Sequence, residues 1–402
     1  MAYYSIFPEK DATIYSHPDR INLNTGQDEI LELAHEYHPS GGLYYPSRIL
    51  IQFKDSEIKD VFENKFPTTT AAYSASIELF AAEHKDVSDT YIISASMLSQ
   101  SWEEGTGRFD STPTSSDGCT WIFRKTSSIT IPGIDAWDAE FGPQSTGSFF
   151  AGGDPTTFSN SEGTGFPSGG GAWYNLYWGA TEVFDKDNRD VEINVTDAIG
   201  AISKTLNIEG IGEDTYPAGI PNNGFIIRKS GRTEQFTASF GELKFFSSDT
   251  HTIYPPKLTF KWDDSNYHPL TAGYPSGTLA GQEMYMTLNN NKKIFQRESQ
   301  PRFRITARKR YPDRTFTTSS NFLDTNYLPT SSFYSIRDAH TDEIIIPFDT
   351  EYTKLSADNK GMYFDLFMEG LQPERYYKIL FKIAYSNETK IIDDDYHFKV
   401  VR

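Results

Sequence analysis

Residues 47–53 read SRILIQF, and this stretch indicates the fold class. The side chains at positions 49, 51 and 53 alternate with those at 48, 50 and 52. That is the period of a β-strand with one face buried more deeply than the other. Similar short runs rich in Val, Ile, Thr, Tyr and Phe recur along the chain, separated by Gly, Pro, Asn and Asp. The sequence therefore predicts an all-β protein built from sandwiches or barrels.

Further strands are expected in both parts of the chain. In the first part they are 12–16, 74–82, 119–124, 190–195, 224–229, 241–247 and 257–262. In the second part they are 284–288, 302–308, 333–337, 343–346, 361–368, 375–384 and 396–401.

Two short helices interrupt this pattern. Residues 55–65 place Ile58, Val61 and Phe62 on one stripe, and Asp55 or Ser56 is expected as the cap. Residues 196–206 do the same with Ile199, Ile202 and Leu206, and Thr196 or Asp197 is the expected cap.

Length and composition exclude several protein classes. A chain of 402 residues predicts two or three domains. Aromatic residues make up 15%, which excludes a disordered chain because each buried ring removes about 150–250 Å² from water. No run approaches the ~18 apolar residues of a membrane span, and the first residues lack a secretory signal pattern. The one cysteine, Cys119, excludes a disulfide framework.

The charge is acidic and unevenly distributed. The net charge is -18, with 18 basic and 19 acidic residues in 263–402 against 19 and 36 in 1–262. An acidic surface repels phosphate backbones, so no nucleic-acid partner is expected. The asymmetry predicts two domains with different surfaces.

The turn-rich stretch 263–283 is the expected linker between these domains. The first domain, 1–262, contains a Gly/Ser-rich insertion at 142–172 that is read as a solvated or subunit-covered loop, or as a ligand-binding loop. The second domain, 284–402, has about seven strands, the size of an immunoglobulin-like or fibronectin-like sandwich. Residues 370–377 resemble the leucine–proline–tyrosine corner of fibronectin type III domains.

Seven segments, in this order along the chain, resemble the DNRLRE family of β-jelly-roll modules. They are the opening strand 7–14, the turn 24–26 with strand 30–33, the arginine-led strand 47–53, the Trp-x-Glu-Gly segment 101–106, the strand-to-helix junction 190–199, and the last strands 223–227 and 255–260. The resemblance covers most of 5–262 and implies a jelly-roll β-sandwich. Members of the family are carbohydrate-binding modules of secreted enzymes and parts of large surface proteins.

The whole chain, notably at 352–356 and 398–400, also resembles virion structural proteins of tailed phages, especially contractile-tailed cyanophages. The missing export signal agrees with this, because virion proteins assemble in the host cytoplasm and are released by lysis. The resemblance implies a non-enzymatic component of the tail, neck (collar) or baseplate, located in the virion, with other virion proteins and copies of itself as partners. The alternative is a glycan-binding module of a phage adhesin or a cell-surface protein.

One basic stripe is a candidate protein interface. Arg302, Arg304, Arg308 and Arg310 recur at intervals of two or four residues on one face of an expected strand, and Arg314 follows. The alternatives are a solvated face, a nucleic-acid contact, or a contact with an acidic protein surface. The acidic first domain is the obvious complement, within one chain or between chains.

One aromatic run is a candidate glycan platform. Trp173, Tyr174, Tyr177 and Trp178 lie within six residues, directly after the Gly/Ser-rich insertion. Flat aromatic faces bind sugars, but Tyr and Trp are equally typical of a core or a subunit contact.

No cofactor is expected, with a structural calcium ion as the alternative. Asp11 with Glu32, or Asp393 to Asp395, are weak candidate ligands. The spacing of His35 and His38 does not match a zinc-protease helix, and Cys119 is expected to be a small buried apolar residue. Adjacent acids at 103–104, 263–264 and 393–395 do not by themselves supply the two carboxylates across a cleft that a glycosidase needs.

Overall fold

In a computed structural model the protein is all-β. The structure describes residues 2–39, 43–66, 72–85, 90–110, 117–125, 137, 149–151, 169–174, 180–185, 190–208, 219–229, 241–268, 284–289, 291–311, 326–384 and 388–402. Strands account for 49% of these residues and helices for 9%. The predicted fold class is therefore confirmed at the level of an all-β protein.

The chain divides into two compact units. The N-terminal unit consists of Ile6–Lys65 and Ser74–Thr259, and the C-terminal unit of Met1–Ser5, Phe66–Tyr73 and Phe260–Arg402. The division falls within the strands β1 (Ala2–Ile6), β5 (Tyr73–Leu79) and β14 (Lys257–Trp262). Most of the predicted linker, 269–283, lies outside the described residues, and so does most of the 142–172 insertion.

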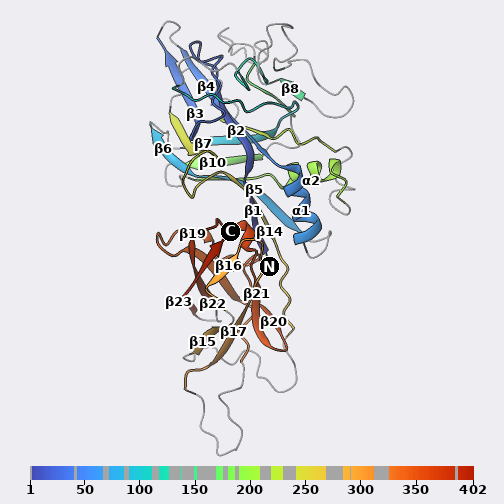
Figure 1. Ribbon diagram of the computed structural model, residues 1–402, viewed down its shortest axis with the longest axis vertical. Helices are drawn as coiled ribbons and strands as arrows, with labels where there is room; N and C mark the ends of the chain where they lie inside the picture. Colours follow the sequence, from blue (N-terminus) through green and yellow to red (C-terminus); the bar gives the residue numbers. More distant parts are fainter. Residues whose placement is uncertain are drawn as a thin grey trace, which may run out of the picture. The chain divides into compact units, whose positions relative to one another are not determined.

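The N-terminal unit is built on one large antiparallel sheet (Figure 1). Its strand order is β10-β7-β12-β4-β3-β13-β6, and β2 also pairs with β4. The bounds are β2 Pro8–Tyr15, β3 Ile30–His38, β4 Leu43–Phe53, β6 Ala81–Lys85, β7 Thr90–Met97, β10 Ala180–Asp185, β12 Phe225–Lys229 and β13 Glu242–Phe246. Separately, β5 pairs with β11 (Val191–Asn194), and β8 (Phe149–Ala151) pairs with β9 (Ala172–Tyr174).

Strand β4 is buried on both faces, which corrects the prediction of one more exposed face. Arg48 and Leu50 are as completely buried as Ile49 and Ile51. The reason is a cluster of buried side chains, here called the second core cluster, that packs on this face of the strand. It contains Leu50 together with the indoles of Trp102, Trp121, Trp137 and Trp173. These rings come from segments far away in the sequence, so the alternation of β4 gives no sign of them.

Both predicted helices are present, but their predicted caps are wrong. Helix α1 (Asp55–Asp60) continues into the π-helical turn η1 (Val61–Lys65), and α2 spans Thr196–Thr205. The N-cap residues are Lys54 and Val195, without side-chain capping bonds. The Asp55 carboxylate instead accepts a hydrogen bond from Asn222 Nδ2 at 2.7 Å.

The predicted strand at 119–124 is also wrong, because this segment satisfies its backbone through local turns and loop contacts. Cys119 N donates to Glu103 O at 2.7 Å, and Thr120 N donates to Phe123 O at 2.7 Å. Cys119 and Trp121 are nevertheless completely buried in the second core cluster. The apolar pattern of this segment therefore reflects its burial, and its backbone does not form the regular hydrogen bonds of a β-strand.

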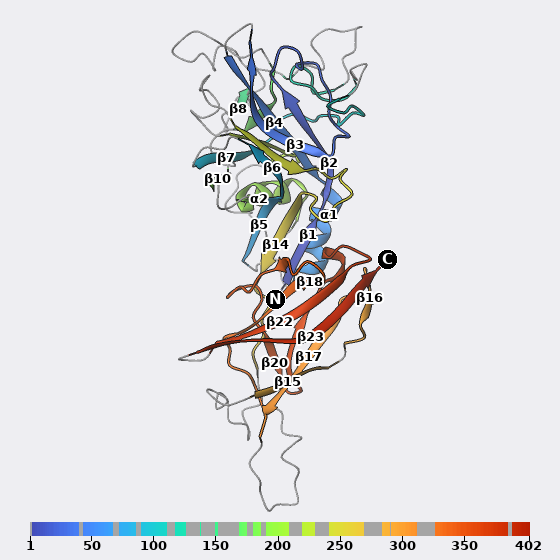
Figure 2. The same cartoon turned by 90° about the vertical axis from the view of Figure 1, so that its left-hand side faces the viewer.

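The C-terminal unit contains two sheets (Figure 2). One has the order β15-β17-β21-β20, and the other has the order β16-β23-β22-β18-β19. The bounds are β15 Met284–Asn289, β16 Ile294–Gln296, β17 Arg302–Lys309, β18 Ser332–Asp338, β19 Ile344–Ile346, β20 Ser356–Asp358, β21 Gly361–Asp365, β22 Tyr376–Ala384 and β23 Thr389–Val401. All pairs are antiparallel except β16 with β23, which is parallel.

One apolar core joins the separate segments of this unit. Phe303, Tyr334, Phe364 and Phe381 are in ring contact, with Tyr334 stacked on Phe364 at 4.3 Å between centroids. Tyr3, from the first segment, belongs to the same buried cluster. Offset and edge-to-face ring contacts of this kind add about 0.5–1.5 kcal/mol each beyond area burial.

The corner before β22 is held by a tyrosine. The Tyr377 hydroxyl donates to Gln372 O at 2.8 Å, five residues earlier in the chain. Tyr377 is 2% exposed, so its ring packs in the core while its hydroxyl closes the corner. The contact lies within residues 370–377, the segment that resembles the leucine–proline–tyrosine corner.

Candidate functional site

Three arginines of the stripe, Arg302, Arg304 and Arg308, lie on β17, and the first two are paired with carboxylates. Arg302 makes two hydrogen bonds to Asp365 at 2.8 Å, and Arg304 makes two to Asp358 at 3.0 and 2.8 Å. The Arg304 side chain holds the pKa of Asp358 below its ordinary value. These two positions therefore carry no net positive charge.

The remaining arginines differ from these two. The Arg308 guanidinium lies 4.7 Å from the centroid of the Tyr285 ring, and Arg310 is exposed beyond the end of β17. Arg314 lies outside the described residues. The opposite face of β17 is core, since Phe303, Ile305 and Ala307 are at most 1% exposed.

Charge reversal should distinguish the paired Arg304 from Arg308, which contacts the Tyr285 ring. We expect Arg304→Glu to lower the free energy of unfolding of the C-terminal unit by about 1–2 kcal/mol, because it breaks a bidentate pair and places two carboxylates side by side. Arg308→Glu should cost about 0.5 kcal/mol, since a surface cation–π contact is lost. Urea denaturation in low and high salt measures both, and salt should reduce the first cost. Equal costs would mean that the Arg304–Asp358 pair contributes no more than the Arg308–Tyr285 contact.

The aromatic run is divided between core and undescribed residues. Trp173 is 4% exposed, and the guanidinium groups of Arg48 and Arg228 lie 5.1 and 4.6 Å from its ring centroid. A ring so enclosed cannot stack on a sugar, so we do not place Trp173 in a glycan site. Tyr174 is half-buried, and burial raises the pKa of its hydroxyl. Tyr177 and Trp178 lie outside the described residues.

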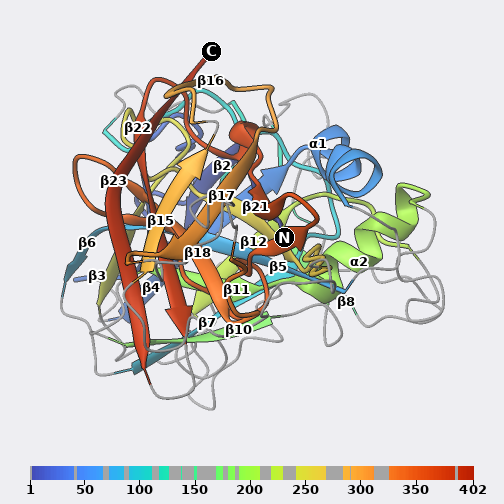
Figure 3. The ribbon, with the colours of Figure 1, turned by 90° about the horizontal axis from the view of Figure 1, so that it is seen from below.

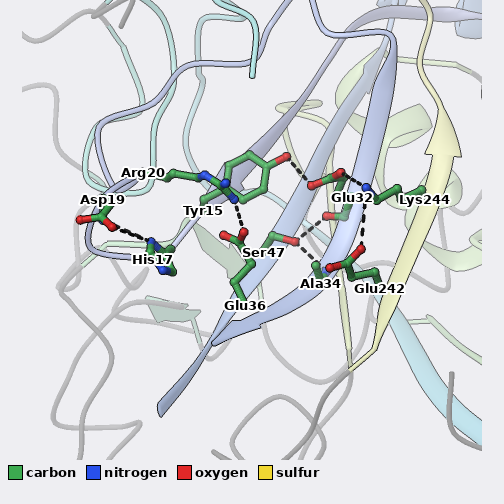
Figure 4. A network of polar contacts seen from close by, with 10 residues as sticks. All are labelled: Tyr15, His17, Asp19, Arg20, Glu32, Ala34, Glu36, Ser47, Glu242 and Lys244. Carbon is green, nitrogen blue, oxygen red and sulfur yellow. Dashed lines mark hydrogen bonds and ion pairs between the residues drawn. The ribbon is translucent and has the colours of Figure 1, made fainter. Parts of the chain in front are cut away.

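Glu32 is part of a polar network on β2, β3 and β13 (Figure 4). Its carboxylate accepts a hydrogen bond from the Tyr15 hydroxyl at 2.9 Å and pairs with Lys244 Nζ at 3.0 Å. Nearby, Arg20 pairs with Glu36. Since Lys244 balances the charge of Glu32, this carboxylate is poorly suited to hold a calcium ion.

Asp11 has different partners. Its carboxylate accepts a hydrogen bond from Ser248 N at 2.8 Å, and Asp11 N donates to Glu104 Oε1 at 2.9 Å. Burial raises the pKa of Asp11 from 3.8 to about 7 and that of Glu104 from 4.5 to about 7. The structure thus joins Asp11 to Glu104, which sequence reasoning did not pair with it. Within the described ranges no group of three or more His, Cys, Asp or Glu could hold a metal ion.

Two further residues considered in the sequence, His35 and Cys119, are buried within the N-terminal unit. His35 is buried on β3, with its Nδ1 3.5 Å from Lys229 Nζ, and Cys119 is a buried free thiol whose pKa burial raises.

Asp393 pairs with Lys378 at 2.6 Å, and Asp395 has a positive φ of 56°. Three residues, 393–395, intervene on β23 where β22 has only Leu380, so the acids form a β-bulge.

A surface that sequence reasoning missed lies at the strand edges of the C-terminal unit. Three edge strands each carry an exposed apolar side chain: Tyr285 on β15 (46%), Ile294 on β16 (60%) and Ile344 on β19 (53%). Ile391 on β23 is 57% exposed. Only the strand order shows which strands are edges, so the sequence offered no direct signal.

Neither a protein-family model nor a curated protein matches this chain. In the described part of the chain, no helix is both long and apolar enough to cross a membrane.

Proposed function

We propose that this protein is a structural component of a tailed-phage virion, in the tail, neck or baseplate region, that acts through protein–protein contacts. Its partners are other virion proteins and copies of itself, its place is the virion, and it performs no catalysis. No cofactor is required for this role.

The observation that carries the proposal is the exposed apolar side chains on edge strands. Natural sheet edges are usually protected by charges, proline, bulges or covering loops, because their free backbone groups pair with other chains. Here β15, β16 and β19 each expose a large apolar residue. Tyr and Ile at such positions gain free energy when another protein surface covers them.

The finer fold assignment belongs to the same proposal. We propose an immunoglobulin-like sandwich for the C-terminal unit, supported by its strand order, its parallel β16–β23 pair and the Tyr377 corner. For the N-terminal unit we propose a jelly roll of the DNRLRE type. The buried arginine of the arginine-led strand and the contact of Glu104 with β2 are compatible with that resemblance.

Incorporation into particles tests the function. We expect the wild-type chain to co-purify with phage particles through a density gradient, and the Ile294→Lys, Ile344→Lys double variant to be incorporated at least tenfold less. The control is Lys360→Ala, which changes an exposed side chain in the turn between β20 and β21. Quantitative mass spectrometry of the particles and circular dichroism of the isolated chains are the measurements.

Absence of the wild-type chain from purified particles would contradict the proposal. Specific binding on a glycan array by a chain absent from particles would instead favour the alternative, a glycan-binding module. No side chain in the described residues singles out that alternative, since Trp173 is enclosed.

A further inference from the structure

The five-stranded sheet of the C-terminal unit ends in two short strands, β16 and β19. Strand β16 pairs with residues 399–401 of β23, next to the end marked C in Figure 3. Strand β19 pairs with β18 at the other end of the sheet. Among the described strands, none pairs with the outer side of β16 or of β19. The sheet therefore has two available edges.

The two edge strands run in opposite directions. Strand β16 is parallel to β23, and the pairs β23–β22, β22–β18 and β18–β19 are antiparallel. A second copy in the same orientation, with its β19 beside β16, would therefore continue the sheet through an antiparallel pair. Antiparallel pairs are the commoner kind in proteins, so the strand directions permit this join.

Each edge has an exposed isoleucine on the face of the sheet that points away from the core. Ile294 is 60% exposed, while its neighbour Phe295 is 8% exposed and belongs to the core cluster. Ile344 is 53% exposed and lies opposite Arg337, whose neighbour Ile336 belongs to the same cluster. Opposed residues of an antiparallel pair share a face, so both isoleucines lie on the outer face. Two copies in the same orientation can therefore oppose one isoleucine to the other.

The two edges carry opposite charge. With two flanking residues on either side of each strand, 292–298 contain three cations and one acid, a net charge of +2, and 342–348 contain two acids and no cation, a net charge of -2. These residues are Lys292, Lys293, Arg297 and Glu298 at β16, and Asp342 and Glu343 at β19. Arg337 on β18 pairs with Asp342 at 3.2 Å, and with Arg337 counted the β19 edge is still negative. Two β16 edges or two β19 edges would repel one another, whereas β16 attracts β19 of another copy.

The register that opposes the two isoleucines is compatible with these charges. Within 292–298 and 342–348 it places Glu343 of the second copy diagonally across from both Lys293 and Arg297. It also places Glu298 diagonally across from Asp342, which already has Arg337 as its partner. Two attractive neighbours therefore stand against one repulsive neighbour.

We propose that a second copy of this chain docks head to tail, with its β19 beside β16 and its Ile344 opposite Ile294. This contact rests on the proposed assembly function, of which it specifies one interface. It is heterologous, because each copy uses one edge for the copy before it and the other edge for the copy after it. Such a contact generates a ring when the rotation closes and an open filament when it does not.

Paired cysteines test the contact directly. Directly opposed residues of an antiparallel pair have Cβ atoms about 4.5–5.5 Å apart, close to the ~3.5–4.5 Å of a disulfide. We expect a mixture of the full-length Ile294→Cys and Ile344→Cys chains to form covalent dimers with oxidised glutathione, at least tenfold more than either chain alone. The control mixture is Ile391→Cys with Ile344→Cys, since Ile391 is 57% exposed on β23, and it should give no more than the single chains. Cys119 does not compete because it is buried.

Two outcomes of the cysteine test contradict the proposal. Single-variant dimers as abundant as the mixed product would mean that the contact is isologous or a random collision. A mixed product no greater than that of the Ile391→Cys control would mean that β16 and β19 do not meet.

Blocking one edge at a time gives the second test. We expect the full-length wild type at micromolar concentration to form oligomers larger than dimers, and Ile294→Lys or Ile344→Lys alone to weaken association at least tenfold. An equimolar mixture of the two variants should form dimers and nothing larger, since it has one intact edge of each kind and the blocked edges oppose lysine to lysine. Ile391→Lys is the matched control and should sediment as wild type. A monomeric wild type, or a mixture that stays monomeric, would overturn the proposal.

The two proposals can fail separately. A wild-type chain that is found in particles, but whose cysteine mixture gives no excess of covalent dimer, keeps the assembly function and removes this contact. A chain whose cysteine mixture gives that excess, but which is absent from particles, keeps the contact and removes the virion role.

Discussion

Substituting Asp11→Asn is expected to raise the free energy of unfolding of the N-terminal unit by about 4 kcal/mol at pH 8 and by less than about 1 kcal/mol at pH 4. Burial raises the pKa of Asp11 from 3.8 to about 7. Ionising this carboxyl in the folded state is therefore costly, and an amide of the same shape avoids that cost. The amide oxygen can still accept the hydrogen bond from Ser248 N.

The direction of the pH dependence follows from the raised pKa. Below about pH 4 the carboxyl is protonated in both states, and its stabilising contribution is fully present. Between about pH 4 and 7 the unfolded chain has lost the proton while the folded chain keeps it, so stability falls as pH rises. Glu104 acts in the same direction, with a smaller effect because its carboxyl is only partly buried.

Denaturation in urea, followed by tryptophan fluorescence from pH 4 to 8, measures this effect. Five of the six tryptophans lie in residues 74–259, so the signal reports mainly on the N-terminal unit. The matched control is Asp19→Asn, since the Asp19 side chain is 76% exposed; it should change stability by less than about 0.5 kcal/mol. A loss of stability in Asp11→Asn at pH 8 would show that the folded state favours the ionised carboxylate.

The second large effect is expected at Arg48. Its side chain is completely buried, its guanidinium lies 4.6 Å from the Trp121 ring centroid and 5.1 Å from that of Trp173, and Nη1 donates to Gly170 O. Arg48→Ala should lower the free energy of unfolding by about 4 kcal/mol or more. The loss combines a cavity among the indoles, two cation–π contacts and an unpaired carbonyl.

Two further variants separate volume from charge. Arg48→Met keeps most of the volume and should cost about 2 kcal/mol, since only the cation–π contacts and the hydrogen bond are lost. Arg108→Ala, at an exposed position in the same unit, should stay within about 0.5 kcal/mol. If Arg48→Met equals or exceeds wild type in stability, the buried charge is a net cost to the fold.

Local periodicity was sufficient for most strands and both helices. The alternation in β17 correctly predicted that Arg302 and Arg304 lie on one face, and the side chains of the other face, Phe303 and Ile305, are buried. Such patterns are local, and each needs only a few neighbouring residues. They also predicted a strand at 119–124, where distant contacts produced buried turns instead.

What the sequence could not reveal depends on partners far along the chain. The arginine spacing did not indicate Asp358 and Asp365, which are 54 and 63 residues away from the arginines they bind. The run Gly169 to Gly171 looked like low complexity, yet all three have positive φ, and a Cβ on Gly170 would lie 2.5 Å from Arg48 Nη1. These glycines are required by the backbone geometry around a buried arginine.

The division of the C-terminal unit into three segments affects the timing of synthesis. Tyr3 and Phe398 belong to the same buried cluster but are 395 residues apart in the chain. At roughly 5–20 residues per second, a ribosome needs about 20–80 s to join them. During that interval the N-terminal unit, whose last residue is 259, can fold, whereas Tyr3 still lacks its partners in the cluster. The order of the segments along the chain therefore leaves Tyr3 accessible to chaperones and to neighbouring nascent chains until the last segment of its unit is made.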